Sequence, residues 1–130
     1  MEATPGLSTP EREMIAVAVS AENRCHYCMV SHGATLRRMT GSPALVDTLG
    51  INYRAADVTP RQRAMLDFAV ALTRDPAAIG ESHRQDLRSA GFTDADIWDI
   101  SEIAAFFNMT NRLASAVGMH PNAEYHALGR

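Results

Sequence analysis

The chain has 130 residues and a mass of 14.1 kDa, a size that fits a single domain with one modest hydrophobic core. Hydrophobic residues make up 46% of it and charged residues 21%, the balance typical of an ordinary soluble globular protein. The net charge of -3 is spread without long runs of like charge, so we expect neither nucleic acid nor an anionic membrane as a partner.

The start of the chain does not resemble a targeting signal. Residues 1–6 lack the basic and apolar regions of a secretory signal, and no apolar run approaches the ~20 residues that a transmembrane helix needs. We therefore expect a cytoplasmic protein. In a reducing compartment, a close pair of cysteines is more often catalytic, redox-sensing or metal-binding than a structural disulfide.

Helix start and stop signals divide the first half of the chain into three predicted helices. Thr9 is expected to cap the first of them, which ends near residues 21–24. A second helix is predicted over about residues 25–39. A short third helix covers residues 43–49 and is expected to end at Gly50.

The second half follows the same pattern. Thr59 opens a helix that ends at Asp75, and a shorter polar helix covers residues 81–89. Thr93 caps the longest element, whose apolar residues recur at helical spacing as far as Gly118. The sequence has almost no strand pattern. The sequence therefore predicts an all-α fold, a compact bundle of five to six helices that forms a single domain over residues 1–130.

The run from Ile103 to Phe107 in the longest helix is apolar over most of its circumference. Such a segment lies either at the centre of a domain or against another subunit, so we expect a homo-oligomer. Three polar residues follow it, Asn108, Asn111 and Arg112, which we interpret as structural residues that pair across the bundle.

The most informative motif is a CxxC pair, Cys25 and Cys28, at the N-terminus of the second predicted helix, followed four residues later by His32. In a helix these three side chains fall within an arc of roughly 60° on one face. A thiol in the first turn meets the positive end of the helix dipole, which favours the thiolate. Histidine exchanges protons near neutral pH, so the motif predicts a dithiol that cycles with a disulfide.

A histidine that takes a proton from a thiol works better when a carboxylate orients it. Glu13 is the first candidate, because its helix is expected to cross the second one, and Glu22 ranks lower because it lies where that helix gives way to a loop. The residues alone do not decide which cysteine attacks. The helix terminus favours Cys25, whereas proximity to His32 favours Cys28.

Two other interpretations of the motif are open at this point. A zinc site could use Cys25, Cys28 and His32, with Glu13 as a fourth ligand, although the chain has no further cysteine for a typical closed site. The dithiol could also belong to a redox sensor or a scaffold that catalyses nothing.

The constellation resembles the alkylhydroperoxidase D-like (AhpD-like) proteins of the carboxymuconolactone decarboxylase superfamily, especially their uncharacterised peroxidase-related branch. The family pattern is a glutamate, a CxxC that begins twelve residues later, and a histidine four residues after the second cysteine. Glu13, Cys25, Cys28 and His32 keep every one of these spacings. The similarity covers essentially the whole chain and includes residues 18–20, 111–112 and 127–130.

The resemblance implies a thiol-dependent peroxidase, a peroxiredoxin-type oxidoreductase that reduces hydroperoxides without haem, flavin or metal. Cys28 would attack the peroxide, Cys25 would resolve the sulfenic acid into a disulfide, and His32 with Glu13 would form a proton relay. An unidentified thiol or disulfide partner would reduce the disulfide again. The resemblance also implies a homo-oligomer, a trimer or a hexamer. The lactone decarboxylase branch of the superfamily is a minor alternative, because it lacks the CxxC constellation.

Tyr27 and His26 are the remaining candidates for lining the site. The alkylhydroperoxidase proper carries a histidine immediately before its second cysteine, whereas this chain has Tyr27 there and His26 one position earlier. A phenol is a poor base at neutral pH. Members of the branch also usually carry additional helical sequence before the segment that begins here at Met1.

Overall fold

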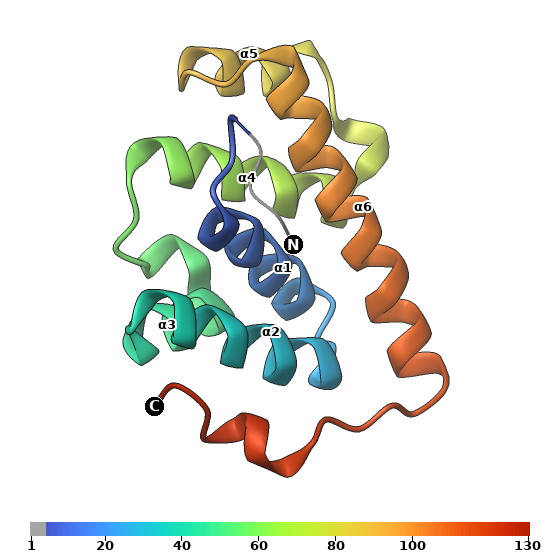
Figure 1. Ribbon diagram of the computed structural model, residues 1–130. Helices are drawn as coiled ribbons and strands as arrows, with labels where there is room; N and C mark the ends of the chain where they lie inside the picture. The colour runs from blue at the N-terminus through green and yellow to red at the C-terminus, as the bar shows by residue number, and fades with distance from the viewer. Residues whose placement is uncertain (1–4) are drawn as a thin grey trace.

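The computed structural model describes residues 5–130 (Figure 1), which form six α-helices and three short 3-10 helices and contain no strand. The α-helices are α1 Thr9–Glu22, α2 His26–Thr40, α3 Pro43–Asn52, α4 Pro60–Arg74, α5 Glu81–Ser89 and α6 Asp94–Ala116. The 3-10 helices are η1 Tyr53–Ala55, η2 Pro76–Ala78 and η3 Ala123–His126. The predicted all-α bundle is confirmed. Residues 1–4, part of the segment examined for a targeting signal, lie outside the described residues.

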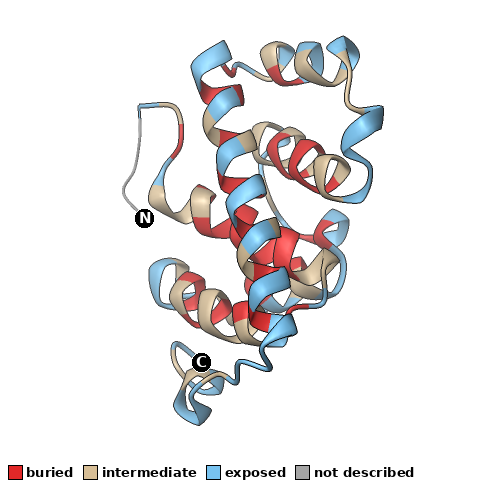
Figure 2. Ribbon diagram, turned by 90° about the vertical axis from the view of Figure 1, so that its right-hand side faces the viewer, coloured by how far each residue is buried: buried red, intermediate tan, exposed pale blue. Residues whose placement is uncertain are grey.

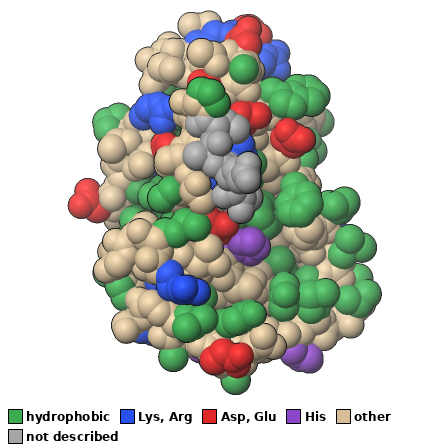
Figure 3. Space-filling model, viewed as in Figure 1, with side chains coloured by type: hydrophobic (Ala, Val, Ile, Leu, Met, Phe, Trp, Pro, Cys, Tyr) green, Lys and Arg blue, Asp and Glu red, His purple; other side chains and the backbone are tan. Residues whose placement is uncertain are grey.

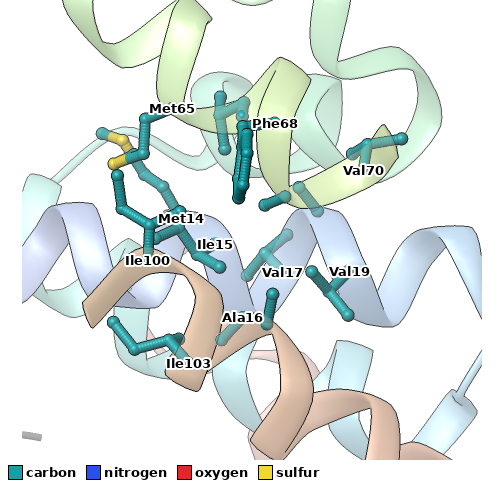
Figure 4. Packing of buried hydrophobic residues seen from close by; sticks show 14 of the residues in the cluster. Met14, Ile15, Ala16, Val17, Val19, Met65, Phe68, Val70, Ile100 and Ile103 are labelled. Atoms are coloured by element: carbon teal, nitrogen blue, oxygen red, sulfur yellow. The ribbon is translucent and has the colours of Figure 1, made fainter. Parts of the chain in front are cut away.

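Helix α1 is the centre of the bundle. It contacts α2, α3, α4 and α6, and every residue from Met14 to Val19 is buried. A helix that is apolar on all sides is stable only where other elements surround it. Figure 4 shows the α1 side chains packed between Met65 and Phe68 on one side and Ile100 and Ile103 on the other. Figure 2 shows that the buried residues lie where the helices face one another, with exposed residues on their outer sides.

Reciprocal capping boxes begin three of the helices. The hydroxyl of Ser8 accepts a hydrogen bond from the Glu11 backbone N–H, and the Glu11 carboxylate accepts one from the Ser8 N–H. The predicted cap at Thr9 is therefore wrong by one residue, because the glutamate that completes the box stands three residues after Ser8. Thr59 and Thr93 cap α4 and α6 as predicted.

Helix α3 continues through Gly50 to Asn52, so the predicted end at Gly50 is wrong. This glycine serves packing rather than termination, because a Cβ atom there would lie 2.7 Å from the terminal methyl carbon of Met29 on α2. Gly41, by contrast, adopts a φ of 65° and ends α2 in the left-handed conformation that favours glycine.

The segment after α6 returns across α2 and α3. The buried Arg37 guanidinium donates hydrogen bonds of 2.8 Å to the carbonyl oxygens of Tyr125 and Leu128, and Arg130 pairs with Asp47 at 3.0 Å. These contacts hold residues 125–130 against the outer face of α2. Helix α6 is the longest at 23 residues, but neither it nor any other helix in residues 5–130 is long and apolar enough to cross a membrane.

Candidate active site

A tight turn between α1 and α2 places both cysteines. Arg24 adopts a φ of 51°, a left-handed conformation that is uncommon outside glycine, and the next residue donates its N–H to the Ser20 carbonyl at 2.9 Å. This residue, Cys25, is the N-cap of α2, and its sulfur accepts a hydrogen bond of 3.4 Å from the Cys28 N–H. Both cysteines are free and buried, so the turn holds the CxxC pair inside the protein.

The cysteines pack against the C-terminal half of α6. Ala114 forms a buried cluster with Cys25 and Cys28, and Thr110 and Asn111 lie one turn earlier on α6. The pKa of the Cys28 thiol is raised from 9.0 to about 11, chiefly by burial and then by a hydrogen bond with Cys25, while the neighbouring side chains of Asn111 and Thr110 act to lower it. A thiol in the first turn of a helix was expected to have a lowered pKa, but this does not hold for Cys28, because burial disfavours its charged form. At neutral pH Cys28 is a thiol that needs a base.

The structure brings His32 and Glu13 together. The Nδ1 atom of His32 lies 2.8 Å from the Oε2 atom of Glu13, whose side chain is only 4% exposed. The His32 ring stands edge-on to Phe107, with 4.7 Å between the ring centroids. A carboxylate at Nδ1 favours the tautomer that carries the proton there and leaves Nε2 free to accept another. His32 also lies one helical turn after Cys28, so the base and the thiol share one face of α2.

The second carboxylate considered from the sequence is occupied elsewhere. Glu22 accepts hydrogen bonds from Arg74 at 2.6 and 3.2 Å, in an ion pair that links α1 to α4. The structure therefore assigns Glu13 rather than Glu22 to the side of His32. Within residues 5–130, no group of three or more His, Cys, Asp or Glu side chains is arranged to hold a metal ion.

A cavity of about 340 Å³ opens beside His32, between α2 and the segment that crosses it. Its lining consists of Tyr27, Ser31, His32, Ala34, Thr35, Arg38, Tyr125 and Leu128. Tyr27 thus lines the cavity and also packs against the two cysteines. His26 is exposed, with its ring centroid 6.0 Å from that of His126, and is not among the residues that line this cavity.

A network of side-chain amides joins the end of α1 to α6 next to the cysteines. The Nδ2 group of Asn23 donates hydrogen bonds of 3.0 Å to the Oδ1 atoms of Asn108 and Asn111, and Asn111 donates one of 2.9 Å to the Ser20 hydroxyl. The two α6 residues do pair across the bundle as predicted, but the position of Asn111 beside the thiols was not predicted. The sequence signal is that Asn111 falls at helical spacing among apolar residues. The buried residues of α6 are Asp96, Ile97, Ile100, Ile103, Ala104, Phe107, Asn111 and Ala114, and of its two polar members Asp96 belongs to the capping box.

Comparisons with known proteins agree with this fold. Residues 1–49 match the carboxymuconolactone decarboxylase family. An uncharacterized peroxidase-related protein from Silicibacter sp. TM1040 is 54% identical, with a TM-score of 0.97 over 100% of this chain and 68% of its own. A second such protein from Ralstonia eutropha JMP134, described as an alkylhydroperoxidase AhpD core, is 48% identical, with a TM-score of 0.96 and the same coverage of 100% and 68%.

More distant structures share the fold. A protein of unknown function from Agrobacterium tumefaciens is 22% identical and superposes with a TM-score of 0.83 over 92% of this chain and 82% of its own. No curated protein matches the chain. The helical bundle and its similarity to these structures place the chain in the AhpD-like class of proteins. The chain belongs to the carboxymuconolactone decarboxylase family, as an AhpD-like member.

Proposed function

We propose that the protein is a thiol-dependent peroxidase that reduces hydroperoxides through the dithiol of Cys25 and Cys28. One observation carries the proposal: the buried Glu13 carboxylate lies 2.8 Å from His32, one helical turn from a thiol that burial keeps protonated. Such a thiol reacts only after a base removes its proton, and an imidazole oriented by a carboxylate is suited to that task.

The proposed reaction begins with proton transfer from the Cys28 sulfur to Nε2 of His32, while Glu13 stabilises the imidazolium that forms. The thiolate attacks the terminal oxygen of the hydroperoxide, the S–O bond forms, the O–O bond breaks, and the alkoxide leaves as an alcohol with the proton from His32. The sulfur of Cys25 then attacks the sulfenic acid, and the hydroxyl group leaves as water. The dithiol supplies both electrons and ends as a disulfide.

The cycle closes when an external dithiol partner reduces the Cys25–Cys28 disulfide, with no part for haem, flavin or metal. The cavity beside His32 is the proposed entry for the hydroperoxide, and Tyr27 would form part of its wall. We place the protein in the cytoplasm, because reductants there return a CxxC pair to the dithiol.

The test is a stoichiometric reaction followed by a turnover assay. Reduced protein mixed with equimolar cumene hydroperoxide should lose both thiols and give the Cys25–Cys28 disulfide together with cumyl alcohol, measured by mass spectrometry and chromatography. Protein alkylated beforehand is the control. Multiple turnovers with a small dithiol should follow. Oxidation that stops after one round would indicate a redox sensor, and no alcohol at all would overturn the proposal.

We further propose that α6 forms an interface between copies of the chain. Large hydrophobic side chains are exposed along it and in the turn that follows: Trp98, Phe106, Met109, Leu113, Val117 and Met119. Figure 3 shows hydrophobic side chains along α6 on the right of the molecule. Residues three or four apart share one side of a helix, so most of this set forms a continuous stripe. A stripe of this kind is typical of a surface that a partner covers.

Charges placed in this stripe should dissociate the assembly. We expect the unmodified protein to elute as three or six copies, and the double variant Met109→Glu, Leu113→Glu to fall to the single-chain mass of 14.1 kDa, because neither glutamate can be buried unpaired. Light scattering after size exclusion measures the mass. Ile51→Glu is the matched control, since Ile51 is 87% exposed on α3, away from the stripe. A monomeric unmodified protein would contradict the interface.

A further inference from the structure

Asn111 has a fully buried side-chain amide, and one of its two N–H groups has no partner among the contacts described so far. It is 1% exposed and lies on the face of α6 that packs against the CxxC pair, one turn before Ala114. A side-chain amide has two N–H donors, and a buried donor without a partner is strongly destabilising. The direction in which this amide points therefore bears on the chemistry of the thiols.

The direction is fixed at the far end of the amide network. The Nδ2 group of Asn108 donates a hydrogen bond of 2.9 Å to the Ala104 carbonyl, which can only accept. The Oδ1 atom of Asn108 accepts one of 2.9 Å from Arg112, whose guanidinium can only donate. Both contacts require the same orientation of the Asn108 amide. Its oxygen therefore faces Asn23.

The orientation passes from Asn108 through Asn23 to Asn111. Because the oxygen of Asn108 accepts, Asn23 has to offer its Nδ2 group there, and the same group donates to the Oδ1 atom of Asn111 at 3.0 Å. The oxygen of Asn111 is thus turned toward Asn23, and its Nδ2 group is turned the other way. One hydrogen of that group goes to the Ser20 hydroxyl at 2.9 Å. The second remains.

The CxxC pair lies against this part of α6, because Ala114, one turn after Asn111, forms a buried cluster with Cys25 and Cys28. The side chain of Asn111 lowers the pKa of the Cys28 thiol, against the larger effect of burial, and Thr110 acts in the same direction. In a site without water, a donor aimed at an anion stabilises it more than it would in solution. The amide is also held in place before any charge forms, because its other contacts already fix it.

We propose that Asn111 donates its remaining amide hydrogen to the Cys28 sulfur, and that this bond selects Cys28 rather than Cys25 as the thiol that reacts. The assignment deepens the proposed peroxidase function and rests on it for the identity of the reaction. Asn111 would then be a catalytic residue in contact with the reacting sulfur. Arg112 and Asn108 would be positioning residues, which act by fixing the direction of the amides between them and the thiol.

The test compares the rate at which the Cys28 thiol is alkylated in variants that replace one side-chain amide by a carboxylate. In a Cys25→Ser background, which leaves one cysteine, Asn111→Asp should slow the reaction of Cys28 with iodoacetamide at neutral pH by about tenfold and move its pH–rate profile to higher pH by about one unit. The carboxylate has the shape of the amide but no N–H. Gln85→Glu is the matched control. It makes the same change from amide to carboxylate at an exposed side chain of α5, outside the amide network, and should leave the rate unchanged.

The carboxylate of Asn111→Asp also brings a negative charge, which by itself disfavours the thiolate, so the uncharged variant Asn111→Leu, which also lacks the N–H groups, should slow the reaction as well. A merely structural role for Asn111 predicts the opposite sign for the uncharged variant. Loosened packing would hydrate Cys28 and speed its alkylation, so an unchanged or faster reaction in folded Asn111→Leu would overturn the inference. Should that variant fail to fold, Asn23→Asp decides, because Asn23 is only half-buried. Without its donor, the Asn111 amide would turn its N–H groups toward the new carboxylate, and alkylation should slow. An unchanged or faster rate there would also overturn the inference.

This experiment uses no hydroperoxide, so its failure is separate from failure of the proposed function. If Asn111→Asp slows alkylation but the protein reduces no hydroperoxide, the proposed hydrogen bond is supported and the proposed peroxidase function is wrong. If the protein is a peroxidase but Asn111→Asp is alkylated at the unmodified rate, the function is supported and the hydrogen bond is wrong. Alkylation of each variant in denaturant should be equal, which checks that the reagent itself reports only on the folded site.

Discussion

Cys28→Ser should abolish hydroperoxide consumption, with a loss of at least about 10³-fold in turnover. A serine hydroxyl has nearly the same shape as the thiol and keeps the first turn of α2, but it is a far weaker nucleophile toward the O–O bond. The loss should appear in an assay that follows hydroperoxide consumption with a small dithiol as reductant. Circular dichroism of the variant should match that of the unmodified protein, because the change leaves the helix intact.

The matched variant is Cys25→Ser. Serine is a good N-cap, so the start of α2, where the Cys25 sulfur now accepts the Cys28 N–H, is preserved. This variant should react once with hydroperoxide and stop at the sulfenic acid of Cys28, which dimedone traps for mass spectrometry. If Cys25→Ser forms no adduct and Cys28→Ser does, the two cysteines have the opposite roles. Full turnover in both variants would remove the dithiol mechanism.

Glu13→Gln should lower the rate of disulfide formation at neutral pH by about 10²-fold. The amide can still accept a hydrogen bond from Nδ1 of His32, but it cannot stabilise the imidazolium that forms when the ring takes the proton of Cys28. Single-turnover kinetics measure the step directly. Glu22→Gln makes the same chemical change at the carboxylate that binds Arg74 and should alter the rate by less than about twofold, since it affects only a partly exposed ion pair.

The pH dependence separates a proton relay from a structural effect of Glu13. The pKa of Cys28 is raised to about 11, so in the proposed mechanism the thiol depends on His32 for deprotonation below that pH, and the thiolate fraction grows as the pH rises toward it. The deficit of Glu13→Gln should therefore shrink with increasing pH, because a thiolate formed by solvent needs no relay. A deficit that stays constant over the whole range would show that Glu13 acts in another way.

Local signals predicted most of the fold because they act within a few residues. Caps at Thr59 and Thr93 each depend on one hydroxyl and one side chain three residues later, so the sequence contains the whole interaction. The end of α3 was missed for the opposite reason. Gly50 reads as a stop signal on its own, and only the approach of Met29 from α2 shows that it serves packing. Helix boundaries that depend on tertiary contacts cannot be predicted from the neighbouring residues alone.

The candidate site divides in the same way. Cys28 and His32 share a helix, so their spacing alone places them on one face, and the meeting of Glu13 with His32 followed from the crossing of two helices. The protonated state of Cys28 and the place of Asn111 beside it did not follow. Both depend on how closely α6 covers the first turn of α2, a contact between residues more than eighty positions apart in the chain.

The position of Glu13 on α1 joins the chemistry to the interior of the protein. This glutamate precedes Met14 in the helix that supplies the centre of the core, so the separation of 2.8 Å from His32 depends on how α1 sits among its neighbours. A displacement of well under an ångström weakens a hydrogen bond, and core substitutions routinely move helices by that much. A small displacement of α1 should therefore lower the activity before it changes the helix content of the protein. If the proposed relay is correct, gradual warming should lower the activity before the helices unfold. Substitutions in the core of α1 should then change both the stability and the activity of the protein.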